Sequence, residues 1–214
     1  MGFEHVWFVN GTAYAGKSTL VKALAEKYDG ILCGENYHDA LLPELDPAEF
    51  PNLCWSRDLE DWHAFIRRTP EEYEAWIIGV TKECEILELR ILGELVKQGR
   101  PIFVDTNLSP ETLRRISDDR HVLILLADPE ISVRRFFARE DGEKQFLYRL
   151  LLEEPDPEAA LANFRECLRR INSRANYERF LRSGFPVLLR EERRTPAQTL
   201  ALAEQIFSLG EAEA

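Results

Sequence analysis

The chain has 214 residues, long enough for one compact domain, and its 45% hydrophobic and 30% charged residues are an ordinary globular composition. Its formal net charge of −11 disfavours a general nucleic-acid binder, because such proteins present a basic field to the phosphate backbone. No stretch approaches the roughly 18 uncharged apolar residues of a membrane helix. Residues 1–10 lead into a strand pattern rather than a signal peptide. Four cysteines without C-x-x-C spacing predict reduced thiols and no zinc site, so we expect a cytoplasmic protein. Because the chain has no apolar stretch of membrane length, we also expect no membrane partner.

Short apolar runs alternate with helical patterns along the chain. The apolar runs predict strands at residues 5–10, 31–33, 101–105, 122–127 and 186–189. Apolar periodicity predicts helices at 17–28, 70–98, 110–119, 130–139, 143–152 and 157–183 (one or two helices), with a last helix that Thr195 caps and Pro196 opens. This alternation predicts an α/β fold with a parallel sheet that helices cover on both faces. In the helix over 70–98, four glutamates fall outside the apolar stripe: Glu83, Glu85, Glu88 and Glu94.

A glycine-rich turn joins the first strand to the first helix and matches the pattern G-x-x-x-x-G-K-[ST]. It reads Gly11-Thr12-Ala13-Tyr14-Ala15-Gly16-Lys17-Ser18, followed by Thr19. Glycines let the backbone N–H groups wrap a phosphate chain, and the following helix directs its positive end at the same anion. Lys17 is expected to reach the β- and γ-phosphates, Ser18 to bind Mg²⁺, and Thr19 to add a phosphate hydrogen bond. The alternative is an ordinary glycine-rich turn.

This loop resembles that of the P-loop NTPases. The run from Val9 to Leu20 is also similar to the start of small-molecule kinases in that superfamily, such as chloramphenicol phosphotransferase, shikimate kinase and the nucleoside monophosphate kinases. The resemblance implies a three-layer α/β/α fold with a five-stranded parallel sheet in the order 2-3-1-4-5, and ATP and Mg²⁺ as cofactors. At fold level it covers 1–35, 100–140 and 184–207. No motif covers residues 36–99 or 140–183.

Two later segments extend the resemblance. The strand 101–105 ends in Asp105, which fits the acid that holds Mg²⁺ directly or through water, although such an acid also caps turns. Arg135 and Arg139 lie four residues apart, so one face of the predicted helix would present both guanidinium groups to a transferring phosphoryl group. The alternative for these arginines is a solvated face paired with neighbouring acids. Residues 140–183 are expected to form a short lid and extra helices.

In kinases of this superfamily, the acceptor site is built largely between the second and third strands, which here means the helical insertion 36–99. Asp39 is the first choice for the acid that positions or deprotonates the acceptor hydroxyl, and Glu35 is the second. Further candidate acceptor contacts are His38, Arg57 and Trp62, which have structural alternatives as a core histidine, a surface charge and a packing aromatic.

These patterns together predict a single kinase-like domain over residues 1–214, a monomer or homodimer, that transfers the γ-phosphoryl group of ATP to a small-molecule acceptor. The catalytic set is Lys17, Asp39, Arg135 and Arg139. The alternative is a nucleotide-binding regulator or weak ATPase without an acceptor. A kinase for nucleic-acid ends is a third interpretation, which the net charge disfavours. The chain lacks the N-K-x-D motif of GTPases, and the sequence leaves the acceptor's identity open.

Overall fold

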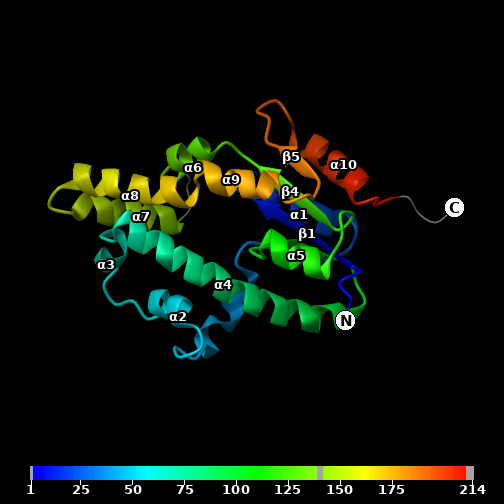
Figure 1. The fold of residues 1–214 in the computed structure, drawn as a ribbon, viewed down its shortest axis with the longest axis horizontal. Coiled ribbons are helices and arrows are strands. Elements are labelled where there is room, and N and C mark those ends of the chain that lie inside the picture. Colours follow the sequence, from blue (N-terminus) through cyan, green and yellow to red (C-terminus); the bar gives the residue numbers. More distant parts are fainter. Residues whose placement is uncertain (1, 139–141, 211–214) are drawn as a thin grey trace. The chain divides into compact units, whose positions relative to one another are not determined.

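The computed structural model describes residues 2–138 and 142–210. Five parallel strands form one sheet in the order β2-β3-β1-β4-β5, as predicted (Figure 1). The strands are β1 (Val6–Gly11), β2 (Ile31–Cys33), β3 (Ile102–Asp105), β4 (Val122–Leu126) and β5 (Val187–Leu189). Every residue of β3 and β4 is buried, because helices cover both faces of a parallel sheet.

Helices fill the connections between the strands. They are α1 (Lys17–Lys27), η1 (Tyr37–Glu44), α2 (Pro51–Arg57), α3 (His63–Ile66), α4 (Pro70–Leu95), η2 (Val96–Gln98), α5 (Pro110–Ile116), α6 (Pro129–Arg135), α7 (Gly142–Glu153), α8 (Pro157–Ile171), α9 (Arg174–Leu181) and α10 (Pro196–Ile206). The predicted helical insertion between the second and third strands is confirmed, with α4 as its long member. At α10 the predicted cap is also confirmed, because Thr195 and Gln198 exchange the two hydrogen bonds of a capping box.

Two helices are shorter than their sequence patterns predicted. The helix expected over 110–119 ends at Ile116, because Ser117 takes an extended conformation. The helix expected over 130–139 ends at Arg135. Phe136 and Phe137 both pack against Phe164, with ring centroids 5.7 and 5.9 Å away, whereas a regular helix would hold neighbouring side chains about 100° apart.

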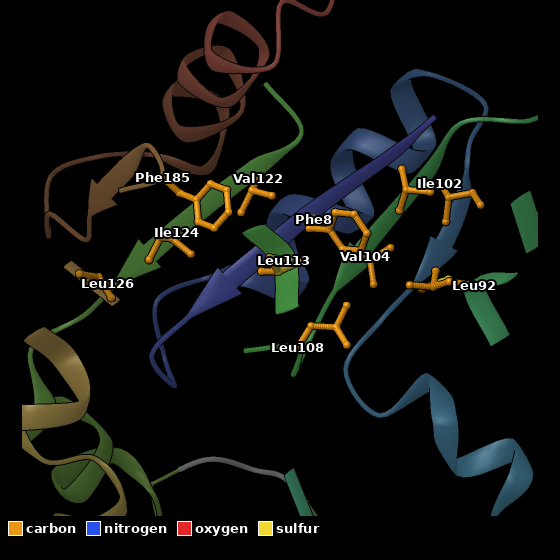
Figure 2. Close-up of a cluster of buried hydrophobic side chains, with 12 residues drawn as sticks. Phe8, Leu92, Ile102, Val104, Leu108, Leu113, Val122, Ile124, Leu126 and Phe185 are labelled. Atoms are coloured by element: carbon orange, nitrogen blue, oxygen red, sulfur yellow. The ribbon is translucent and has the colours of Figure 1, made fainter. Parts of the chain in front are cut away.

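The described residues group into two compact units, and one of the points where the chain passes between them lies inside α4. The first unit contains residues up to 41, 84–127 and those from 177 onward. On one face of its sheet, Leu92 of α4 and Leu113 of α5 belong to the same buried apolar cluster as Phe8 of β1 (Figure 2). On the other face, α1 and α10 pack through a second apolar cluster that includes Leu24 and Ala203. These are the three layers that the sequence predicted.

The second unit contains residues 42–83 and 128–176 and is helical. Its core is largely aromatic, and Phe65, Tyr73 and Phe164 are each at least 95% buried. Helices α7 and α8 lie side by side within it (Figure 1). Both segments for which the sequence offered no motif contribute to this unit. Among the described residues, no helix is both long and apolar enough to cross a membrane.

Candidate phosphate-binding site

Gly11 ends β1 at a point where the neighbouring backbone leaves no room for a side chain. Its φ is 127°, and a Cβ atom there would lie 1.8 Å from the carbonyl oxygen of Leu125 on β4. Only glycine permits this approach. In the sheet, β1 lies between β3 and β4, and the chain leaves the sheet at the carboxyl end of β1. In open α/β sheets, ligands bind at such strand ends, where the strand order reverses.

The start of the loop is tied to the end of β4. The amide of Thr12 donates to the carbonyl of Leu125 at 3.0 Å. The amide of Ala127 donates to the Thr12 hydroxyl at 2.7 Å, and this side chain is buried. Thr12 therefore fixes the loop to the sheet, a role that its unspecified position in the motif did not predict.

Left-handed residues turn the rest of the loop. Tyr14 has a φ of 62° and Gly16 a φ of 99°, and such turns direct successive N–H groups into an anion-binding nest. A Cβ atom at Gly16 would meet nothing within 4 Å, so the glycine serves backbone conformation there rather than space. Ala15 packs partly buried against the α1 side of the sheet. Ala13 and Thr19 are exposed.

Lys17, Ser18 and Asp105 come together at the start of α1. The Ser18 hydroxyl donates to Asp105 Oδ2 at 2.7 Å. Lys17 Nζ lies 3.7 Å from Asp105 Oδ1 and donates to the carbonyl of Thr12 at 3.4 Å. Sheet register explains the arrangement, because Asp105 pairs with Val9, two residues before the loop begins. The two predicted magnesium ligands and the predicted phosphate lysine therefore form one cluster.

The Asp105 carboxyl group is 97% buried, and this burial raises its pKa. Lys17 and the hydrogen bond from Ser18 act in the opposite direction, and the charges of Glu35 and Glu88 add to the rise. A divalent cation bound at this carboxyl group would relieve the cost of burying it, because it supplies the missing opposite charge. Among the described residues, no cluster of three His, Cys, Asp or Glu ligands surrounds a metal position. A cation here would therefore rely on few protein ligands, as Mg²⁺ does when phosphates and water complete its coordination.

The three candidates after β2 differ in their surroundings. Glu35 is exposed and lies close enough to Asp105 to affect its pKa. Asp39 is 54% exposed, and its partial burial raises its pKa while the neighbouring His38 lowers it. His38 is 97% buried, with Nε2 3.6 Å from Asp39 Oδ1 and 3.2 Å from Cys84 Sγ. The buried position of His38 matches the core histidine that the sequence left open as its alternative.

The remaining candidates lie in the second unit. Arg57 pairs with Asp58 at 2.7 Å and donates to the carbonyls of Leu42 and Leu45. Trp62 packs against Phe65 and Phe146, with ring centroids 5.5 and 5.9 Å away. These contacts are the structural alternatives that the sequence allowed for both residues.

Of the two arginines predicted to face the transferring phosphoryl group, Arg135 is exposed at the last position of α6, and Arg139 lies outside the described residues. The helix that was expected to carry both arginines ends at Arg135, so their shared face stays a prediction. The predicted lid itself begins within the same undescribed gap, so its first residues are also outside the description.

A pocket of about 550 Å³ opens within the second unit. Its lining residues are Glu130, Val133, Arg134, Phe137, Ala138, Tyr148, Arg165 and Arg169. Three arginines against one glutamate give this pocket a positive balance, which favours anionic ligands.

Sequence reasoning missed two residues that hold this region together. Glu88 of α4 is fully buried and accepts hydrogen bonds from Thr106 and Asn107, directly after Asp105. Arg190, which follows β5, donates to the carbonyl of Tyr14 in the loop. Glu88 lies 18 residues from Thr106, and Arg190 lies 176 residues from Tyr14, so no local pattern could reveal either contact.

Comparison with known proteins adds no relative: no protein-family model matches the chain, and no curated protein matches it. The sheet order, the interleaved helices and the loop after β1 are consistent with a P-loop NTPase fold.

Proposed function

We propose that the protein is an ATP-dependent small-molecule kinase that acts in the cytoplasm. One observation carries the proposal: Lys17, Ser18 and Asp105 form a single cluster beside the loop that leaves β1. An ammonium group, a hydroxyl and a carboxyl at the mouth of a backbone nest are the groups that a magnesium-bound triphosphate requires.

The residues present fit Mg²⁺ because the hydroxyl of Ser18 and the carboxyl of Asp105 both offer oxygen ligands. When bound, this ion would neutralise phosphate charge. The Lys17 side chain is 15% exposed, and its Nζ, which donates to a loop carbonyl, would exchange that weak bond for phosphate oxygens. The amides of the loop and the start of α1 would hold the remaining charge of the phosphate chain.

The acceptor side of the proposal rests on the segment after β2. Asp39 would orient the acceptor hydroxyl toward the γ-phosphate, with Glu35 as the second candidate for that role. Arg135 and Arg139 would stabilise charge on the transferring group, and the acceptor is a small molecule of unassigned identity.

A second function, a nucleotide-binding regulator or weak ATPase, has one observation in its favour. Arg57, a candidate acceptor contact, is paired with Asp58. Arginines held by partner carboxylates are less free to bind a substrate.

Binding of ATP in the presence of Mg²⁺, measured by titration calorimetry, tests the shared core of both functions. Lys17→Ala should weaken binding about 30-fold or more, because truncating one partner of a hydrogen-bonded charge pair costs about 2–5 kcal/mol. Lys22→Ala is the matched control, since Lys22 is on the same helix, is 67% exposed and lies 3.9 Å from Glu26. Equal affinities of the two variants would rule out the proposed phosphate site.

Incubation with ATP labelled at the γ-phosphate and with fractionated metabolite pools separates the two functions. A kinase should transfer the label to a small molecule in an amount that depends on the pool. A regulator or weak ATPase should release only inorganic phosphate, slowly and at the same rate in every pool.

A further inference from the structure

The side chain of Glu88 lies in the interior of the first unit. It is 0% exposed, although it falls outside the apolar stripe of α4. Burying a carboxyl group is costly unless hydrogen bonds satisfy its oxygens. Its environment must therefore compensate for burial, and the donors that do so reveal what Glu88 holds.

The donors belong to the two residues that follow Asp105. The Thr106 hydroxyl donates to Glu88 Oε2 at 2.6 Å, and the Asn107 side-chain amide donates to Oε1 at 2.8 Å. The backbone amide of Asn107 donates to Oε2 at 3.1 Å. These bonds hold the chain where it leaves β3, at the two residues that follow Asp105.

A second segment meets the same carboxyl group. His38 Nδ1 lies 3.6 Å from Glu88 Oε1, and it is a buried nitrogen with no hydrogen-bond partner among the described residues. The opposite ring nitrogen, Nε2, faces Asp39 at 3.6 Å. Glu88 therefore lies between the loop that carries Asp105 and the turn that carries Asp39.

We propose that Glu88 is a positioning residue that sets the geometry of Asp105 and Asp39 together. The inference rests on the proposed function, in which Asp105 serves the metal and Asp39 the acceptor. Residues that orient metal ligands through hydrogen bonds affect metal affinity by about 10–100-fold when they are changed. A purely structural anchor in the core would affect stability alone.

The chain provides a matched control on the same helix. Glu83 is 7% exposed and accepts from the Asn52 backbone amide at 3.0 Å, the Asn52 side chain at 2.6 Å and the Leu53 amide at 2.8 Å. Glu83 and Glu88 are thus two buried glutamates with similar numbers of bonds. Glu83 holds the start of α2 in the second unit, whereas Glu88 holds the loop after β3.

The experiment compares Glu88→Gln with Glu83→Gln in the full chain, using the Mg²⁺ concentration that gives half-maximal ATP binding. Both variants should lower Tm by similar amounts. Glu88→Gln should raise the Mg²⁺ midpoint about 10–100-fold, and Glu83→Gln should leave it unchanged. If Glu88→Gln does not fold, Thr106→Val is the alternative, because it removes the shortest hydrogen bond to Glu88. It should shift the Mg²⁺ midpoint in the same direction by a smaller factor.

Amide hydrogen exchange of the nucleotide-free protein supplies a readout that does not depend on ATP. Glu88→Gln should increase exchange at 105–109 and 37–39, and Glu83→Gln only near Asn52. If the wild-type protein binds ATP with Mg²⁺ but Glu88→Gln leaves both the midpoint and the exchange unchanged, the positioning role is wrong and the proposed function stands. If the wild-type protein does not bind ATP, the proposed function fails and the positioning role fails with it.

Discussion

The Ser18 hydroxyl donates a 2.7 Å hydrogen bond to Asp105 Oδ2 and so joins the first turn of α1 to the end of β3. The two residues are 87 positions apart in the chain. Because β3 and β1 are neighbours in the sheet, the loop that follows one strand meets the end of the other. An oxygen pair held in this way is already arranged for a hard cation before any nucleotide binds.

Replacing the Asp105 carboxyl group with an amide should therefore make ATP binding depend less on Mg²⁺. Asp105→Asn keeps the side-chain volume and removes the charge. The factor by which Mg²⁺ raises the affinity for ATP should therefore fall at least about tenfold, which corresponds to about 1.4 kcal/mol. Affinity for ATP without the ion should be equal or slightly higher, because a negative charge near the phosphates is gone. Calorimetry with and without Mg²⁺ measures both quantities. Asp118→Asn, an exposed acid of the same unit, is the control. An unchanged Mg²⁺ effect in Asp105→Asn would exclude this carboxyl group from the metal site.

The two glycines of the loop should respond differently to alanine. Gly11→Ala places a methyl group against the Leu125 carbonyl as well as straining φ, so we expect the sheet to be disrupted and little soluble protein to form. Gly16→Ala meets open space and should fold, losing about 1–2 kcal/mol through its left-handed backbone. Thermal unfolding of the two variants tests this contrast. Similar stability of both would show that β1 does not approach β4 so closely at Gly11.

The contrast between Gly11 and Gly16 could not be predicted from the sequence. The motif names Gly11 and Gly16 alike, because it records residue types at fixed spacing. A separate pattern predicted Asp105, since an apolar run that ends in an acid is a local signal. The sheet order then brings Asp105 beside the loop. Whether a Cβ atom at either glycine would clash depends on the neighbouring strand, and only the structure shows that.

Contacts between distant parts of the chain were the least predictable. The pattern of α4 placed Glu83 and Glu88 away from its apolar stripe, yet both are buried, because donors from other segments satisfy them. The end of α6 was also missed, because Phe136 and Phe137 both pack against Phe164, a residue from a distant segment of the chain. Helical periodicity within one segment contains no information about such partners.

The cysteines should be inert in the folded protein. All four are buried, and burial raises the pKa of the Cys33 thiol to about 12 and that of Cys167 to about 11. At pH 8 the reactive thiolate fraction of Cys33 is then on the order of 10⁻⁴, far below that of a free thiol. Iodoacetamide should label the protein only after denaturation, as mass spectrometry would detect. Native labelling of Cys33 at the rate of a free thiol would show that the end of β2 is accessible.

The last prediction concerns the acid that serves the acceptor, where the sequence ranked Asp39 above Glu35. The structure gives the two residues different neighbours. Glu35 lies within the electrostatic reach of Asp105, whereas Asp39 lies beside the buried His38. Glu35→Gln should therefore weaken Mg²⁺-dependent ATP binding a few-fold, because a negative charge near the cation is lost.

Asp39→Asn should leave ATP binding unchanged and lower kcat for transfer on the order of 100-fold, the usual contribution of a positioned acid or base. Steady-state kinetics, once a label-accepting metabolite has been found, distinguish the two roles through kcat and through the Mg²⁺ dependence of ATP binding. A large fall in kcat in Glu35→Gln, with Asp39→Asn close to wild type, would reverse the ranking. It would also assign the acceptor acid to the first residues after β2, within the field of Asp105, rather than to the first turn of η1.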